Sequence, residues 1–183
     1  MNSKTNTTKK TKNYAFIDSQ NLNMGIRRLG WKMGFKKLRV YLKEKYNVKK
    51  AYLFIGYMPE NQNLYRSLQE RGYVLIFKPI LKKKDGSVKG NVDAELVLQA
   101  MIDYEEYDKA IIISSDGDFY CLVNYLYDKN KLASVISPCY ETCSILLKRS
   151  AKEKIVFINN LRKKLEYKKA PQEDKTSRGT FSS

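Results

Sequence analysis

The chain has 183 residues, of which 35 are Lys or Arg and 19 are Asp or Glu, so its formal net charge is +16. The length predicts one domain with short tails, and the 43% hydrophobic content excludes wholesale disorder. The sequence contains no histidine, which excludes Ser-His-Asp triads, Cys-His nucleophiles and His-ligated zinc. Any catalysis must therefore use carboxylates, amines, hydroxyls or a metal ion held by oxygen.

Cysteine usage and the lack of long apolar runs bear on the compartment. Cys121, Cys139 and Cys143 are too few for a four-cysteine zinc site, and an odd number is a poor disulfide scaffold. Residues 1–13 lack the apolar stretch of a secretory signal, and no apolar run approaches the roughly 18 residues of a membrane span. We therefore expect a soluble cytoplasmic protein without a membrane partner.

The chain divides into three parts by composition. We expect a basic flexible arm at 1–13, a folded domain at 14–165 and a disordered polar tail at 166–183. In chain order, the domain predicts a strand at 14–18, a helix around 35–42, a strand at 50–57, a helix around 64–68, a strand at 73–80, a helix around 94–101, a strand at 110–114, a helix around 119–126, and strands at 132–137 and 155–158. Weaker helix signals cover 145–149 and 161–165.

This alternation of strands and helices predicts the fold class. It implies a parallel sheet with right-handed crossovers and helices on both faces. The strand segments are nearly continuously apolar, which is typical of strands buried on both faces. Segment 81–91 interrupts the rhythm, and its Asp85-Gly86 pair predicts a turn at the tip of an extended, lysine-rich loop.

Acidic residues follow two predicted strands and open one predicted helix. Asp18 ends the first strand, Asp116 and Asp118 follow the strand at 110–114, and Asp93 lies at the start of the helix around 94–101. Sites in open α/β sheets form beyond the carboxyl ends of the strands, so these acids meet if the two strands are neighbours. Each acid near a helix start is individually explained by capping, but their coincidence favours a site.

Grouped carboxylates need a counter-charge. Two of them about 4 Å apart repel by about 1 kcal/mol in water and about 4 kcal/mol at an effective dielectric constant of 20. Oxygen ligands without nitrogen or sulfur point to Mg²⁺ or Mn²⁺. Such a site supports metal-dependent phosphodiester hydrolysis, a reaction that needs no histidine.

Other polar residues are candidates for substrate binding. Asn21 can orient Asp18 or a phosphate, although a turn or cap role also explains it. Ser115 has no base to activate it as a nucleophile and is a candidate contact to substrate. The remaining candidates are lysines that can steer phosphate groups or simply form a solvated surface: Lys82, Lys83, Lys84 and Lys89.

The positive charge predicts attraction to polyanions, with nucleic acid first. Aromatic residues lie among the dispersed basic ones, where they either stack on bases or belong to the core: Trp31, Phe35, Tyr41 and Tyr46.

Three segments resemble the NYN domain family, and more narrowly its LabA-like branch within the PIN-like nuclease superfamily. They are FIDSQNL (16–22), KGNVDAELVLQAM (89–101) and IIISSDGDFYCLV (111–123), and LGWKMGFKKL (29–38) looks like the same branch. The resemblance spans about residues 14–158. It implies a Rossmann-like three-layer α/β/α sandwich with a mostly parallel sheet, a Mg²⁺ or Mn²⁺ site, and RNA as the commonest substrate.

Five residues match the family's functional positions. These are Asp18, Asn21, Asp93, Asp116 and Asp118, whereas Ser19 and Ser115 stand where the family commonly has glycine. We expect a metal-dependent ribonuclease in which Asp18, Asp93 and Asp116 hold the first metal ion and Asp118 serves a second or substrate-bridging one.

The sequence leaves alternatives for the substrate, the oligomeric state and the activity. Single-stranded DNA is a second substrate class, and the chain is a monomer or a homodimer. The alternatives to an RNA-cleaving enzyme are a non-catalytic RNA-binding module on the same fold and a phosphatase acting on small molecules.

Overall fold

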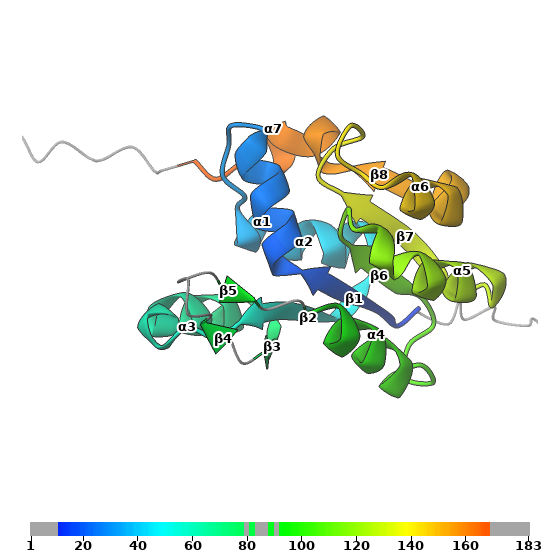
Figure 1. Ribbon diagram of the computed structural model, residues 1–183, viewed down its shortest axis with the longest axis horizontal. Coiled ribbons are helices and arrows are strands. Elements are labelled where there is room, and N and C mark those ends of the chain that lie inside the picture. The colour runs from blue at the N-terminus through cyan, green and yellow to red at the C-terminus, as the bar shows by residue number, and fades with distance from the viewer. Residues whose placement is uncertain (1–10, 79–80, 83–87, 90–91, 169–183) are drawn as a thin grey trace, which may run out of the picture.

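A parallel six-stranded sheet forms the centre of the molecule (Figure 1). The computed structural model describes residues 11–78, 81–82, 88–89 and 92–168. All neighbouring strands pair in parallel, in the order β3-β2-β1-β6-β7-β8. The strands are β1 (Asn13–Asp18), β2 (Val48–Gly56), β3 (Val74–Lys78), β6 (Ala110–Ile113), β7 (Leu132–Ser137) and β8 (Ile155–Phe157). This order is that of a doubly wound sheet, so the predicted α/β class is confirmed.

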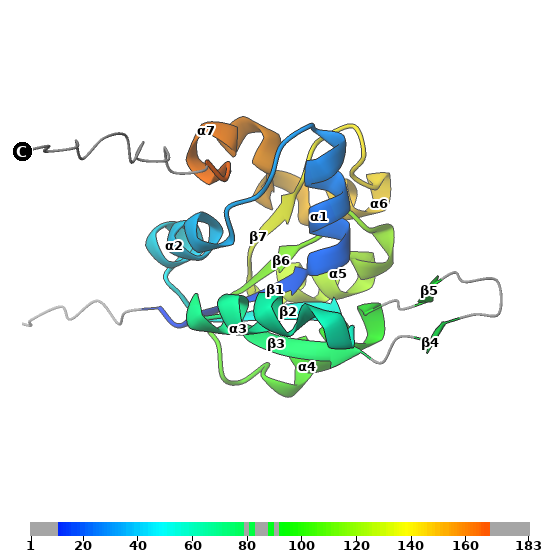
Figure 2. The same cartoon turned by 90° about the vertical axis from the view of Figure 1, so that its left-hand side faces the viewer.

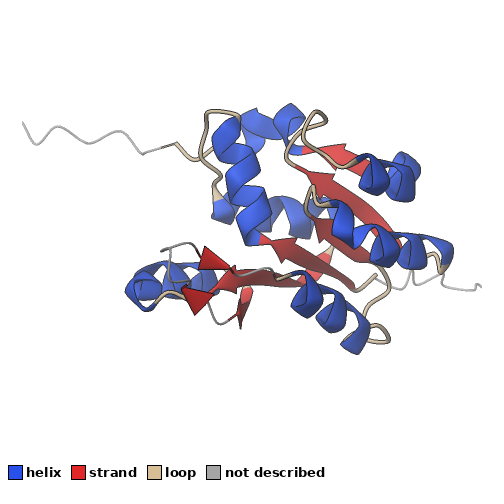
Figure 3. Cartoon of the chain, viewed as in Figure 1, coloured by secondary structure: helices blue, strands red, loops and turns tan. Residues whose placement is uncertain are grey.

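Helices cover both faces of the sheet, which gives three layers (Figures 2 and 3). One face packs against α1 (Ser19–Arg28), α2 (Phe35–Tyr46), α3 (Gln62–Glu70) and α7 (Arg162–Leu165). The other packs against α4 (Asp93–Ile102), α5 (Tyr120–Asp128) and α6 (Ile145–Ala151). Short 3₁₀ turns are η1 (Pro59–Asn61), η2 (Gly117–Phe119), η3 (Lys152–Lys154) and η4 (Ile158–Leu161), and β4 (Leu81–Lys82) pairs antiparallel with β5 (Val88–Lys89).

Strand β1 shows how the sequence fills both core layers. Successive side chains of a strand point to opposite faces. Ala15 and Ile17 therefore pack among α1 and α2, whereas Tyr14 and Phe16 pack among α4 and α5. Trp31 is also buried in the α1–α2 layer, so it belongs to the core and does not offer a surface for bases.

The two edge strands depart from the expectation that the strands are buried on both faces. Val74 and Phe77 of β3 are about two-fifths exposed, and β8 is half-buried throughout. Both strands have a neighbour on one side only and lie where the helix layers end. The expectation holds for the central strands and is wrong for β3 and β8.

Helix α1 is the one main element that the sequence pattern does not predict. Its core face consists of Leu22 and Ile26, and Gly25 between them lowers helix propensity. The signals that identify it are at its ends. The Asp18 side chain caps the first turn, and two arginines lie in the last turn, where the helix dipole favours cations. The strands and helices that the sequence does predict are present among the described residues.

Some predicted segments fall outside the described residues. These are residues 1–10 of the arm, 169–183 of the tail, the Asp85-Gly86 turn, Lys83 and Lys84. Among the residues that are described, no helix combines the length and apolar character needed to cross a bilayer.

Candidate metal centre

The predicted acidic residues gather where β1 and β6 end. The two strands are parallel neighbours, and the chain continues from them towards opposite sides of the sheet. Strands β1 and β6 lie side by side in Figure 1. Asp18 is the last residue of β1, and Asp116 follows β6 at the start of η2. Ligand sites of open α/β sheets form at this reversal of strand order, so the fold itself positions the site.

Three of the four acids approach closely enough to share one cation. Asp93, Asp116 and Asp118 each offer a carboxylate oxygen, and these oxygens all lie within 4.8 Å of one another. Asp93 and Asp116 are half-buried, whereas Asp118 is exposed. Asp18 lies deeper, with only 5% of its surface exposed, and is outside this group.

Asp18 is nevertheless electrostatically part of the site. The pKa of its carboxyl is raised to about 6, chiefly by burial and in smaller part by the nearby Asp93 and Asp116 carboxylates. Hydrogen bonds from the Asn21 backbone N–H (3.0 Å) and the Ser114 hydroxyl (3.3 Å) act in the opposite direction. The balance leaves a buried carboxyl whose charged form is disfavoured in the absence of a cation.

Asn21 and Ser114 brace the two halves of the site. The Ser114 Oγ donates to Asp18 and accepts from the backbone N–H of Asp116 at 3.1 Å. The Asn21 Oδ1 accepts from both the backbone N–H (2.9 Å) and the hydroxyl (2.7 Å) of Ser115. These contacts tie the start of α1 to the loop after β6, so the acids that follow the two strands are held together.

The turn that carries Asp116 and Asp118 is fixed by close packing. The Asp116 Oδ1 accepts from the Asp118 backbone N–H at 3.1 Å, which caps η2. A Cβ at Gly117 would lie 2.5 Å from the Ser144 Oγ, closer than real contacts allow. Gly117 therefore permits the turn to rest directly on the start of α6.

Helix α4 positions Asp93 from the other side of the site. Leu96 and Ala100 bury the helix against the core, and Glu95 in its first turn pairs with Lys78 of β3 at 3.1 Å. Asp93 is the first residue of the helix, where the dipole favours a negative charge. Packing and an ion pair thus aim Asp93 towards the turn after β6.

The donor set fits a hard divalent cation. Oxygen ligands lie about 2.1 Å from Mg²⁺, so two ligands of one ion are at most about 4.2 Å apart. Oxygens within 4.8 Å of one another reach this spacing with shifts below about 1 Å. Asp93, Asp116 and Asp118 supply oxygen alone, the ligand type of Mg²⁺ and Mn²⁺.

A polar cleft of about 360 Å³ adjoins the acids. It contains two of the predicted substrate contacts, Asn21 and Ser115, together with Asp116. Its other lining residues include Arg28, Thr142 and Ser144, which sequence reasoning did not identify. Arg28 lies seven residues after Asn21, a spacing that places both residues on one face of a helix. Because the sequence pattern did not predict helix α1, this spacing could not be used to identify Arg28.

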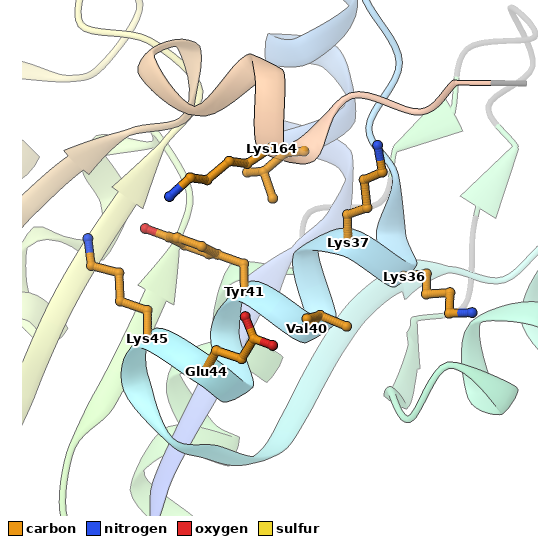
Figure 4. A pocket seen from close by; sticks show the side chains of 8 residues that line it. Lys36, Lys37, Val40, Tyr41, Glu44, Lys45 and Lys164 are labelled. Atoms are coloured by element: carbon orange, nitrogen blue, oxygen red, sulfur yellow. The ribbon is translucent and has the colours of Figure 1, made fainter.

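The predicted lysine contacts are not brought to the acids by any described interaction. Lys82 and Lys89 lie on β4 and β5, and Lys83 and Lys84 are outside the described residues. A larger groove of about 820 Å³ lies between α2 and α7, where Lys45 and Lys164 flank the Tyr41 ring (Figure 4). Among the described residues that line it, Glu44 is the only acid and four are lysines, so this groove is basic and does not resemble the acidic cluster.

Comparisons with known proteins agree with this architecture. The sequence model of the NYN domain matches residues 13–159. The low amplitude and bright protein LabA of Synechococcus elongatus is 25% identical over 167 residues, which cover 86% of this chain and 89% of LabA. A crystal structure of a Vibrio parahaemolyticus protein of unknown function superposes with a TM-score of 0.73 at 23% identity. The superposition covers 86% of this chain and 97% of the Vibrio protein, so the two proteins have the same fold. The chain belongs to the NYN domain family.

Proposed function

We propose that the protein is a metal-dependent ribonuclease. In this proposal Asp93, Asp116 and Asp118 hold the metal ion at the site where RNA phosphodiester bonds are hydrolysed. The observation that carries the proposal is the meeting of these three carboxylates within 4.8 Å at the reversal point of the sheet. Membership of the NYN domain family and the similarity to LabA support a nuclease or RNA-related role.

The residues of the site have distinct roles in this proposal. Asp93, Asp116 and Asp118 hold Mg²⁺ or Mn²⁺, and the geometry favours Asp118 over the deeper Asp18 as a direct ligand. When bound, the ion supplies acidification of water and charge neutralisation for phosphodiester hydrolysis. Asp18 adds negative charge behind the ligands, held by Asn21 and Ser114.

The substrate class follows from charge. A net charge of +16 favours a long polyanion over a small phosphomonoester. The lysines around the α2–α7 groove add positive potential on the helix layer that also contains α1. RNA is the proposed substrate, with single-stranded DNA as the second choice.

Cleavage of labelled single-stranded RNA tests the proposal. Wild type, Asp116→Asn and the exposed control Asp128→Asn are compared in Mg²⁺, Mn²⁺ and EDTA. Wild type and Asp128→Asn should cut only with metal, and Asp116→Asn should lose at least about 100-fold, because a lost ligand removes several kcal/mol of charge stabilisation.

Two outcomes contradict the proposal. Intact RNA in every reaction, with salt-sensitive binding on a gel, identifies a non-catalytic RNA-binding module. Hydrolysis of p-nitrophenyl phosphate without cleavage of RNA identifies a phosphatase.

A further inference from the structure

The cleft beside the acids is formed by one stripe of helix α1 and two loops. Asn21, Met24, Gly25 and Arg28 line it at the spacing i, i+3, i+4 and i+7, which places them on one face of the helix. The facing wall is formed by the turn after β6 (Ser115, Asp116, Gly117) and the loop before α6 (Thr142, Ser144).

Close backbone approaches form the base of this cleft. A Cβ at Gly25 would lie 2.4 Å from the Pro138 Cγ, so α1 approaches the segment after β7 only because residue 25 has no side chain. The contact between Gly117 and Ser144 fixes the opposite wall in the same way. The backbone N–H of Ser144 also donates to the Ser115 carbonyl at 3.0 Å. The cleft therefore has a shape set by packed elements.

The polar groups of the cleft suit a phosphate-bearing ligand. Arg28 provides a cation with several N–H donors, and Thr142 and Ser144 provide hydroxyls. Both hydrogen bonds of the Asn21 side chain use Oδ1. Among the described residues, neither the Asn21 Nδ2 nor the Arg28 guanidinium donates to another protein group. Both donor groups are thus available to a ligand.

We propose that this cleft binds the nucleotide next to the scissile phosphate, with Arg28 contacting the following phosphate of the strand. The inference rests on the proposed ribonuclease function. Asp116 belongs both to the metal-binding cluster and to the cleft wall, so a strand with one phosphate at the cluster enters the cleft with its neighbouring nucleotide. The volume of about 360 Å³ lies in the range of about 300–1,000 Å³ typical of small-ligand sites.

Adjacent arginines provide a matched pair of variants. Arg27 and Arg28 are both exposed in the last turn of α1, but only Arg28 lines the cleft. Arg27→Ala and Arg28→Ala remove the same charge from the same helix. Each is tested for binding of a fluorescent RNA tetranucleotide in EDTA, and for Mn²⁺-dependent hydrolysis of RNA and of bis(p-nitrophenyl) phosphate, which has no neighbouring nucleotide.

Arg28→Ala should weaken RNA binding and lower kcat/KM on RNA by about 10-fold or more, the size of one charge-assisted hydrogen bond. Arg27→Ala should change either value by less than about 2-fold, and both variants should hydrolyse the small diester like wild type. Arg28→Lys should recover part of the loss, because an ammonium keeps the charge but not the planar fork.

Equal effects of the two alanine variants on RNA would overturn the cleft assignment. So would an equal loss on RNA and on the small diester in Arg28→Ala, because that result places Arg28 at the reacting phosphate. A wild type that binds RNA with the expected Arg28 dependence but cleaves neither substrate supports the cleft and contradicts the ribonuclease.

Discussion

Helix α4 has an aspartate at each end, and the two ends have opposite surroundings. Asp103 follows the last helical residue and is only 8% exposed. It accepts hydrogen bonds from the Tyr52 hydroxyl and from the Gln99 side chain (3.2 Å), and the Lys50 ammonium lies at 4.0 Å. Asp93, at the first residue, faces two further carboxylates. The described neighbours of Asp103 are donors and a cation, whereas those of Asp93 include two carboxylates.

We expect this difference to separate a structural carboxylate, Asp103, from the proposed metal ligand, Asp93. Removing a buried acid that has donors and a cation destabilises the fold, because its partners are left buried without it. Carboxylates that share a site repel one another, and a bound cation relieves this repulsion. Clusters of this kind are typical of functional sites, where a protein is less stable than it would be with residues chosen for stability alone.

The largest stability effect is expected at the compensated end. Asp103→Ala leaves the buried Tyr52 hydroxyl without its acceptor and removes the partner of Gln99 and Lys50. The free energy of unfolding should fall by about 3 kcal/mol. Urea denaturation measures the loss, with the exposed neighbour Glu105→Ala as a control that should change stability by less than about 0.5 kcal/mol. A loss as small as that of the control would show that Asp103 is not a structural carboxylate.

The opposite sign is expected at Asp18, whose carboxyl is buried beside the acidic cluster. The pKa of Asp18 is about 6 in the folded protein against 3.8 as its ordinary value. The folded state therefore binds more protons between these values, and stability falls as pH rises through this window. Asp18→Asn mimics the protonated form, so it should stabilise the metal-free protein by about 2 to 3 kcal/mol at pH 8 and by almost nothing below pH 3.8.

Denaturation in EDTA across pH 3.5 to 8 measures this effect. A variant that is less stable than wild type at pH 8 would contradict the argument that the charged form of Asp18 is disfavoured in the fold.

A divalent cation should reduce the repulsion among the carboxylates near Asp93 and so stabilise the folded protein. Metal that binds only the folded state stabilises it by RT ln(1 + [L]/Kd), which is about 1.4 kcal/mol at ten times Kd. Wild type and Asp103→Asn should both show this gain with Mn²⁺, and Asp116→Asn should not. Thermal unfolding with and without Mn²⁺ provides the measurement, and an equal gain in all three proteins would place the metal elsewhere.

The smallest effect on stability is expected at Gly117, the first residue of η2. Gly117→Ala places a Cβ against Ser144, and the resulting overpacking should cost about 1 kcal/mol and displace Asp116 from Asp118. The apparent Kd for Mn²⁺ should therefore rise. Gly30→Ala, at a positive φ of +77° beyond the C-terminal end of α1, should also lower stability through backbone strain but leave metal binding unchanged. Calorimetric titration with Mn²⁺ compares the two variants.

Local patterns predicted the central strands and the acids at their ends, because a buried apolar run followed by Asp18 or Asp116 is visible in the sequence. That these acids lie near each other follows from the pairing of β1 with β6, which the strand pattern left open. The family resemblance implied a shared metal site but not this strand order. The cleft was not predictable, because Arg28 lines it only through its position on helix α1, and the sequence pattern of that helix is weak. Thr142 and Ser144 come from a loop that only the tertiary fold brings alongside it.

The two aspartates of α4 provide the most direct test of the account. Mn²⁺ binding and RNA cleavage would be measured in the same preparations of wild type, Asp93→Asn and Asp103→Asn. We expect Asp93→Asn to fold but to lose both metal binding and cleavage, and Asp103→Asn to be less stable but to keep both. Cleavage by Asp93→Asn at the wild-type rate, or cleavage by wild type in EDTA, would show that this acidic cluster does not hold a catalytic metal ion.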